Sequence, residues 1–341
     1  GRELAPKYWN CRGTFIHITG FPFPLPGDPY GTGPLSRMAY MTGWISNHYW
    51  NRYLYMQDLE WLRSYGYPVM RDCALFYVDF LEKWDDGLYH AFPSLQGEAV
   101  FNGSSEKFTD QPQVIRHARF CLMTTIEASE LLGLDGELRN EWREVHDNLV
   151  VADDLEAIGL TEEEKERYRL NPPEFQGWDV GRGFPRPGDQ CRCLQDRRGG
   201  RWGSISSAQI PWQLLIYLRN RAFEPARDYP RYRDLIQRMR LDNGSMPALS
   251  QQGLGYTGLY VESLSMSAPM QEMMLASWDG VIRLYSQWPT EVDACFETFR
   301  AEGAFLVSSA FKDGEVHSLT ITSEAGKRCR LQQPWDGPLA V

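Results

Sequence analysis

Hydrophobic residues recur every three or four positions over most of the first 278 residues, which is the spacing of one face of an α-helix. This pattern predicts long helices over 35–56, 69–80 and 114–132. A shorter helix is expected to begin at Asp58, because aspartate is a good N-cap residue. Further helical runs cover 137–149, 206–221 and 227–241, and a Met-rich helix starts near Pro269.

The pattern changes after residue 280 to short runs typical of strands. Strands are expected over 281–285, 303–311 and 315–323, and Asp313-Gly314 provides a hairpin turn between the last two. Because the helices follow one another without alternating strands, the chain is predicted to be mainly α. We expect a helical toroid or solenoid over 1–280 and a small antiparallel β module over 281–341.

Composition narrows the class of protein. The hydrophobic fraction of 43% is ordinary for a folded protein, and the aromatic fraction of 13%, with 12 Trp and 17 Tyr, favours carbohydrate weakly, because flat rings stack on sugars. A net charge of -10 argues against a nucleic-acid partner. No run of eighteen apolar residues predicts a membrane helix, and no signal sequence is visible at the start.

The cysteines give no sign of a metal site or a disulfide framework. There are 7 of them, an odd number at scattered positions without CxxC spacing. Cys73 and Cys121 lie on apolar helix faces and are predicted to be small core residues. We therefore expect neither a metal ion nor another cofactor.

One carboxylate lies in an unusual setting within the stretch 92–103, between two predicted helices. Glu98 is flanked by Gly97, Ala99 and Val100, and an apolar, partly dry environment raises the pKa of a glutamate. Such a group keeps its proton at neutral pH and can act as a general acid. Spacing alone favours the alternative, in which Glu98 is a surface residue on a turn.

Three runs, taken together and in this order, resemble glycoside hydrolase family 95, the α-L-fucosidase and L-galactosidase group. They are H-Y-W-N-R-Y-L-Y at 48–55, P-S-L-Q-G-E-A-V-F at 93–101, and E-M-M-L-A-S-W-D-G-V-I-R-L at 272–284. The resemblance covers most of the chain. It implies an (α/α)6 barrel followed by a C-terminal β domain, and it implies a glycoside hydrolase that acts on a terminal sugar of a glycan.

The resemblance also implies an inverting mechanism with two carboxyl groups. The family's general acid corresponds to Glu98, and the only carboxylate in the window of the family's base, 260–265, is Glu262. In such enzymes the acid protonates the leaving oxygen, and the base activates water on the opposite face, with about 6.5–9.5 Å between the two carboxyl groups. An alternative for Glu262 is a helix-entry residue favoured by the helix dipole.

Four further residues are candidates for sugar binding, although each could instead be a core or surface residue: His17, His48, Trp50 and His90. The chain also departs from the family pattern. The base window lacks the family's Gly-Asn-Phe-Gly run, region 171–203 contains no His, and only eight or nine helices are predicted where a barrel of this kind has about a dozen.

These departures leave alternatives to a complete hydrolase. The toroid is expected to be incomplete at its N-terminus, as in the C-terminal portion of a longer protein or a reduced relative. The chain could be a non-catalytic carbohydrate-binding relative that has lost the base, or a structural fragment of a toroid that is inactive alone. By resemblance only, a secreted or periplasmic location is expected, with a glycan as the partner.

Overall fold

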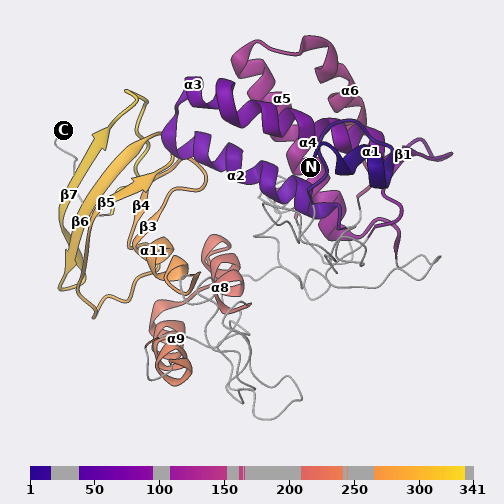
Figure 1. The fold of residues 1–341 in the computed structure, drawn as a ribbon. Helices are drawn as coiled ribbons and strands as arrows, with labels where there is room; N and C mark the ends of the chain where they lie inside the picture. The colour runs from indigo at the N-terminus through magenta and orange to yellow at the C-terminus, as the bar shows by residue number, and fades with distance from the viewer. Residues whose placement is uncertain are drawn as a thin grey trace. The chain divides into compact units, whose positions relative to one another are not determined.

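The computed structural model describes two compact units, one within residues 1–176 and one within 177–341, called unit 1 and unit 2 below. The predicted domain boundary at residue 280 stays a prediction. Figure 1 shows the helices of unit 1 and, in unit 2, helices followed by a sheet. The residues described are 1–16, 38–94, 108–151, 161–163, 165, 209–240, 244 and 265–334.

Unit 1 is built around three mutually packed helices, α2 (Tyr40–Met56), α4 (Tyr67–Phe80) and α5 (Pro112–Leu132). Helix α6 (Gly136–Asp147) packs against α5. The remaining elements are α1 (Leu4–Trp9), α3 (Leu59–Trp61), the π-helical turn η2 (Leu62–Gly66), and the short strands β1 (Glu82–Lys83) and β2 (Tyr89–His90).

The predicted helix ends are confirmed where side chains or glycine set them. Asp58 caps α3 by accepting a hydrogen bond from the backbone N–H of Trp61 at 2.9 Å. Gly133 ends α5 in the left-handed conformation, with φ of 65°. The gap that the sequence pattern leaves before the helix at 69–80 is absent, because the chain stays helical through η2 and directly into α4. Pro68 has no N–H to donate to the carbonyl four residues earlier, and its ring crowds that carbonyl. The wider π turn before Pro68 relieves this crowding.

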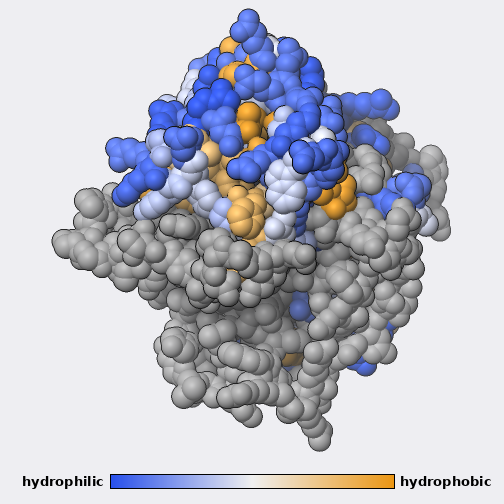
Figure 2. Space-filling model, turned by 90° about the vertical axis from the view of Figure 1, so that its right-hand side faces the viewer, coloured by the Kyte–Doolittle hydropathy of each residue, from blue (hydrophilic) through white to orange (hydrophobic). Residues whose placement is uncertain are grey.

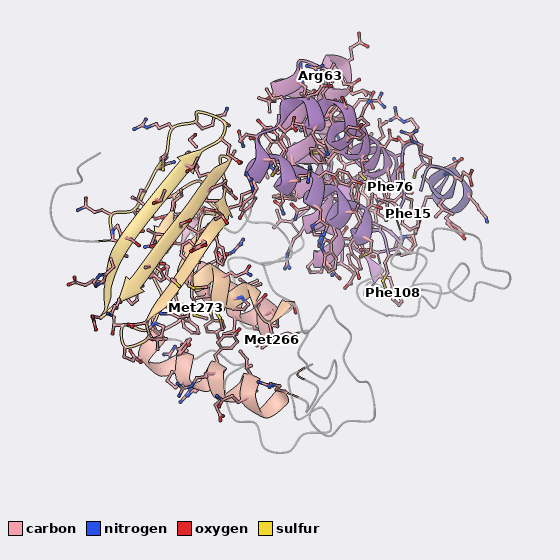
Figure 3. The ribbon with its side chains drawn as sticks, turned by 60° about the vertical axis from the view of Figure 1, so that its left-hand side comes forward. Phe15, Arg63, Phe76, Phe108, Met266 and Met273 are labelled. Atoms are coloured by element: carbon pink, nitrogen blue, oxygen red, sulfur yellow. The ribbon has the colours of Figure 1, made fainter. Side chains whose placement is uncertain are left out.

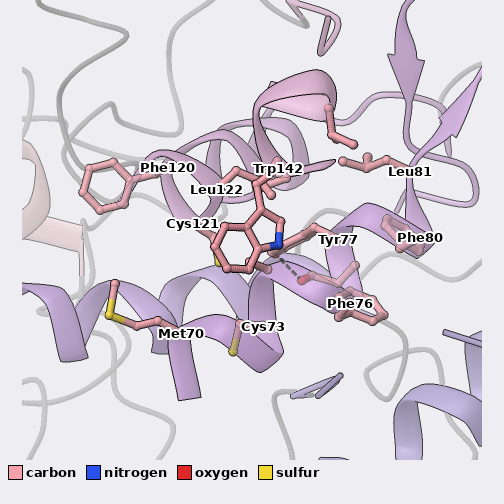
Figure 4. Packing of buried hydrophobic residues seen from close by; sticks show 14 of the residues in the cluster. Met70, Cys73, Phe76, Tyr77, Phe80, Leu81, Phe120, Cys121, Leu122 and Trp142 are labelled. Carbon is pink, nitrogen blue, oxygen red and sulfur yellow. Dashed lines mark hydrogen bonds between the residues drawn. The ribbon is translucent and has the colours of Figure 1, made fainter. Parts of the chain in front are cut away.

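The core of unit 1 is formed by large side chains from α4, α5 and α6. Trp142 of α6 and Tyr77 of α4 are fully buried in it (Figure 4). Cys73 and Cys121 are buried and free, which confirms that they are small core residues. The Phe15 ring packs against Phe76 with centroids 5.3 Å apart, which joins the N-terminal segment to this core (Figure 3).

Unit 2 combines helices with antiparallel strands. Its core contains Met266, Met273 and Tyr232, among other buried residues (Figure 3). The main sheet has the order β5-β6-β7, and β3 pairs with β4 separately. The elements are α8 (Gln209–Arg219), α9 (Pro225–Met239), α11 (Ala268–Met274), β3 (Leu275–Ala276), β4 (Arg283–Leu284), β5 (Ala294–Ala301), β6 (Phe305–Lys312) and β7 (Glu315–Ser323).

The sheet confirms the predicted hairpin and adds a strand that the pattern does not predict. Asp313 and Gly314 both have positive φ values, of 50° and 83°, and Lys312 pairs with Glu315 across the turn. Strand β5 carries a bulge between Phe296 and Phe299 that shifts its register. The bulge replaces the alternation of two with a spacing of three, so the sequence pattern hides the strand.

Among the described residues, no helix has both the length and the hydrophobicity that crossing a bilayer would require.

The contact between α2 and α5 depends on a glycine. A Cβ atom at Gly43 would lie 2.5 Å from the carbonyl oxygen of His117, which is backbone and cannot rotate away. Gly43→Ala should therefore separate the two helices and lower the free energy of unfolding by about 1–3 kcal/mol. Urea unfolding followed by circular dichroism measures this.

Gly136→Ala is the matched control, because a Cβ there meets only the side chain of Arg139, at 3.2 Å. Its free energy of unfolding should stay unchanged or rise by up to about 1 kcal/mol. Equal stability losses in the two variants would contradict this account of the helix contact.

Candidate functional site

Three of the six predicted site residues, Glu98, Glu262 and His17, lie outside the described residues. His48 and Trp50 lie on α2, and His90 lies on β2. Among the described interactions, these last three side chains make no hydrogen bond or ring contact with one another. The structure therefore describes two separate groups of candidate residues, one on α2 and one in the connection from α4 to α5.

The α4–α5 connection begins with the β1–β2 hairpin, whose β2 edge pairs with the residues that follow α6. The N–H of Tyr89 donates to the carbonyl of Asn148 at 2.8 Å, and the N–H of Val150 donates to the carbonyl of Tyr89 at 3.1 Å. In addition, the ammonium of Lys83 lies 2.6 Å from the Glu144 carboxylate of α6. The β2 edge and the Lys83 side chain thereby fix the hairpin to the helical core. The face opposite Lys83, which carries the exposed Trp84, is called the outward face below.

His90 is held between two carboxylates beneath that outward face. Its Nδ1 lies 2.6 Å from Asp110 Oδ2, and its Nε2 lies 3.0 Å from Asp86 Oδ2. The imidazole stacks on the indole of Trp84, with ring centroids 4.1 Å apart and planes 15° apart. Burial by itself lowers the pKa of His90, but the hydrogen bonds to the two carboxylates outweigh it and raise the pKa above the ordinary 6.5.

Asp110 also joins the two ends of the connection through the backbone. Its Oδ1 accepts from the N–H of Ala91 at 2.8 Å, and its own N–H donates to the carbonyl of Ala91 at 3.0 Å. Nearby, the N–H of Ser94 donates to the carbonyl of Phe108 at 2.6 Å, and Ser94 Oγ accepts from the N–H of Gln111 at 2.9 Å. Residues 94 and 108, which flank the segment with Glu98, are therefore fixed to each other.

His48 lies at an exposed position of α2, close to a second histidine. Desolvation by its neighbours lowers the pKa of His48, although part of its ring remains exposed. His117 on α5 is only 3% exposed and contacts the rings of Tyr40 and Trp44. Burial, with smaller contributions from Arg116 and His48, lowers the pKa of His117 to about 4.

His117 is therefore neutral at pH 7. Its Nδ1 lies 2.7 Å from the carbonyl oxygen of Gln113 and donates to it, which makes Nε2 the acceptor nitrogen. Nε2 is buried and has no hydrogen-bond partner among the described residues. Trp50, by contrast, is 4% exposed and packs on Tyr53 as a core residue does. A sugar-binding role for Trp50 stays a prediction.

Unit 2 contains one carboxyl group with a strongly shifted pKa. Burial raises the pKa of Glu302 to about 7; the N–H of Gly280 and the Arg219 guanidinium oppose the rise, while Asp279 and Glu272 add to it. Arg219 pairs with Glu272 at 3.0 Å. Burial next to this ion pair accounts for the raised pKa of Glu302, so the shift requires no catalytic role.

Among the described residues, no group of three or more His, Cys, Asp or Glu side chains could hold a metal ion. The expectation that the protein needs no metal or cofactor stays a prediction.

Comparison with known proteins gives the family of the helical part. Residues 1–170 match the family model described as the glycosyl hydrolase family 95 catalytic domain. Over these residues, the chain belongs to family 95. This confirms the family that the sequence runs at 48–55 and 93–101 predict.

One curated relative is alpha-L-fucosidase 2 of Arabidopsis thaliana. It is 38% identical over 101 residues, which are 30% of this chain and 12% of that protein. The chain thus matches only a small part of the length of this relative.

A solved structure shows the fold. A putative kojibiose phosphorylase from the human microbiome superposes with a TM-score of 0.50 and 10% sequence identity, over 85% of this chain and 47% of that chain. That protein is an (α/α)6 toroid enzyme. The likeness confirms the predicted fold class, mainly α of the toroid type with a small antiparallel β module at the C-terminal end.

The sequence does not reveal the residues that organise this family 95 connection. Asp110 and His90 are 20 residues apart, and no periodicity relates them. The spacing of four residues between Asp86 and His90 is a local signal that could have linked these two. The sequence contains no signal for Trp84 beyond its aromatic character, because its role depends on its stacking on His90.

Asp110→Asn tests the clamp on His90. Removing the carboxylate should lower the pKa of His90 toward or below 6.5, while asparagine tolerates the positive φ of 48° at this position. Because the folded-state pKa is raised, the stability that His90 contributes is complete below 6.5 and is lost as the pH rises through that folded-state pKa. The free energy of unfolding of the variant should therefore be about 1–3 kcal/mol lower at pH 6. Above pH 6 it should decline less with rising pH than that of the unsubstituted protein.

Histidine NMR titration measures the pKa, with His90→Gln used to assign the signal, and urea unfolding measures the stability. Asp85→Asn, which removes an exposed carboxylate from the same hairpin, should leave both quantities unchanged. An unchanged pKa of His90 in Asp110→Asn would show that the carboxylate does not control it.

Proposed function

We propose that the chain is the catalytic part of a glycoside hydrolase that removes a terminal fucose- or galactose-type sugar from a glycan with inversion. Glu98 acts as the general acid and Glu262 as the base. The observation that supports this most is the family 95 catalytic-domain match over residues 1–170, which include Glu98. The match to a protein named alpha-L-fucosidase 2 supports a fucose-type sugar.

The anchoring of the α4–α5 connection supports the role of Glu98. Glu98 follows Ser94 by four residues, and four residues span at most about 14 Å whatever conformation they adopt. Ser94 is fully buried and bonded to both Phe108 and Gln111. A catalytic group attached close to such a fixed point needs less reorganisation to reach its substrate, which is the physical basis of preorganised catalysis.

The chemistry requires the acid to keep its proton until the bond breaks. Gly97, Ala99 and Val100 around Glu98 offer no charge to stabilise its carboxylate, so its pKa is expected to be raised. Glu98 then protonates the leaving oxygen as the sugar gains oxocarbenium character. Glu262 removes a proton from the water that attacks the opposite face of the ring.

The candidates for sugar binding follow the same proposal. His17 directly follows Ile16, whose N–H donates to Thr42 Oγ1 on α2 at 3.0 Å. His48 lies on the same helix and is partly exposed. We assign both to the sugar pocket, and we assign the protein to a secreted or periplasmic location, where glycans are the substrates.

A second candidate function is binding of a carbohydrate without hydrolysis. The family match ends at residue 170, so Glu262 lies beyond it, and the base window 260–265 differs from the family pattern. A relative that lost its base would bind the glycan and turn none over. Binding that persists in Glu98→Gln, together with no turnover by the unsubstituted protein, would favour this function.

Glu98→Gln separates the two candidates. Hydrolysis of fucosyl-α1,2-lactose, whose sugar leaving group needs protonation, should fall by about 10²–10⁴-fold. The rate of hydrolysis should fall by a comparable factor in Glu262→Gln. Glu106→Gln, in the same segment as Glu98, should retain the original rate. The reaction is followed by NMR, which also reports the anomer released.

Release of the inverted anomer, with activity lost in both variants, supports the proposal. A rate in Glu98→Gln equal to that of the unsubstituted protein would remove Glu98 from the mechanism. Release of the retained anomer would contradict the role of Glu262 as a base.

A further inference from the structure

We propose that the outward face of the β1–β2 hairpin, centred on Trp84, binds a sugar of the glycan on the leaving-group side of the cleaved bond. This inference rests on the proposed function and extends it to a residue that the family match does not assign. It predicts that the hairpin recognises the part of the substrate that remains after the terminal sugar has left.

The first step is the exposure of Trp84. Glu82 pairs with His90 across the hairpin, so residues 82, 84, 88 and 90 share one face, opposite the face from which Lys83 pairs with Glu144 of α6. Trp84 is 41% exposed, and Leu88 beside it is 37% exposed. Figure 2 shows one side of the molecule on which the described surface is mostly hydrophilic, with hydrophobic residues in small groups. Ligand sites are lined mainly by hydrophobic and aromatic side chains, and Trp84 with Leu88 offers such side chains to a ligand.

The second step is rigidity. The indole of Trp84 lies flat on His90, which two carboxylates hold at 2.6 and 3.0 Å. One ring face is therefore covered, and the other face is presented to solvent in a fixed orientation. A ring that is already immobilised loses little conformational entropy when a ligand stacks on it.

The third step is the chemistry of the acidic residues next to Trp84, called the rim below. Glu82, Asp85 and Asp86, the acidic residues that flank Trp84 in the chain, are exposed, and the neighbouring Lys83 is paired with Glu144. These carboxylates repel phosphate or acidic sugars but accept hydrogen bonds from hydroxyl groups. A flat apolar ring with acceptors around it therefore fits a neutral pyranose, whose C–H face stacks on the indole while its hydroxyls donate to the rim.

The fourth step is the place in the chain. The hairpin and Glu98 belong to the same connection between α4 and α5, and Asp110 ties the two parts together through His90 and Ala91. In an enzyme that removes a terminal sugar, the rest of the glycan extends outward past the acid. Within the described part of this connection, the outward face with Trp84 could receive the rest of the glycan.

The test compares two substrates of the same terminal sugar. The leaving group of fucosyl-α1,2-lactose is a disaccharide. The leaving group of α-L-fucosyl fluoride is a fluoride ion, which carries no sugar. Trp84→Ala should lower kcat/KM for the trisaccharide about tenfold, mainly through KM, and change it less than twofold for the fluoride. Trp84→Phe should recover most of the loss, because it restores an aromatic face.

Tyr65→Ala is the control, since Tyr65 is an aromatic residue of unit 1 that is 67% exposed on η2. It should change neither rate. An equal loss on both substrates in Trp84→Ala would show that Trp84 acts only through the structure of the connection. No loss on the trisaccharide would show that no sugar binds there.

The failure of the proposed function is distinguishable from the failure of this inference. If the unsubstituted protein hydrolyses neither substrate, the proposed function is wrong. Lactose binding, measured by calorimetry, then tests the hairpin alone. Trp84→Ala should weaken it about tenfold relative to Tyr65→Ala. Equal affinities in the two variants, or no lactose binding by the unsubstituted protein, would overturn the inference.

Discussion

The hydrogen bonds of Asp110 close the long connection between α4 and α5, and the arrangement of the candidate site depends on them. One carboxylate oxygen orients His90, and the other receives the N–H of Ala91. His90 in turn supports the indole of Trp84. The same closure brings Ser94 against Phe108, so that the segment with Glu98 starts and ends at a fixed place. A single, partly buried carboxylate therefore links the segment with the proposed acid to the proposed sugar platform.

The helical core beneath supplies a second constraint, because close packing of α2 on α5 leaves no space for a side chain at residue 43. The hydroxyl of Tyr77 accepts from the N–H of Gly43 at 2.9 Å and donates to the carbonyl of Ala39 at 2.8 Å, which fixes the first turn of α2 on α4. His48 lies on the same helix, two turns further along. The position of this candidate sugar-binding residue is thus set by core packing rather than by contacts of its own.

Sequence reasoning succeeded where the determining interactions are local. Helix α5 was predicted with its end because apolar spacing and Gly133 act within a few residues. Strand β5 was missed because its bulge breaks the alternation, and the clamp on His90 was missed because Asp110 is distant in the chain. Glu98 emerged from family resemblance, since its spacing alone favoured a surface turn. Local patterns specify elements, whereas the connections between them depend on tertiary contacts that no periodicity encodes.

The most direct test of the central claim is a crystal structure of Glu98→Gln with fucosyl-α1,2-lactose bound. The account predicts the side chain of residue 98 about 2.6–3.2 Å from the glycosidic oxygen, and Glu262 about 6.5–9.5 Å from residue 98 across the sugar. It also predicts a lactose ring stacked on Trp84. A trisaccharide bound away from residue 98, or Glu262 on the same side of the sugar as residue 98, would contradict the account.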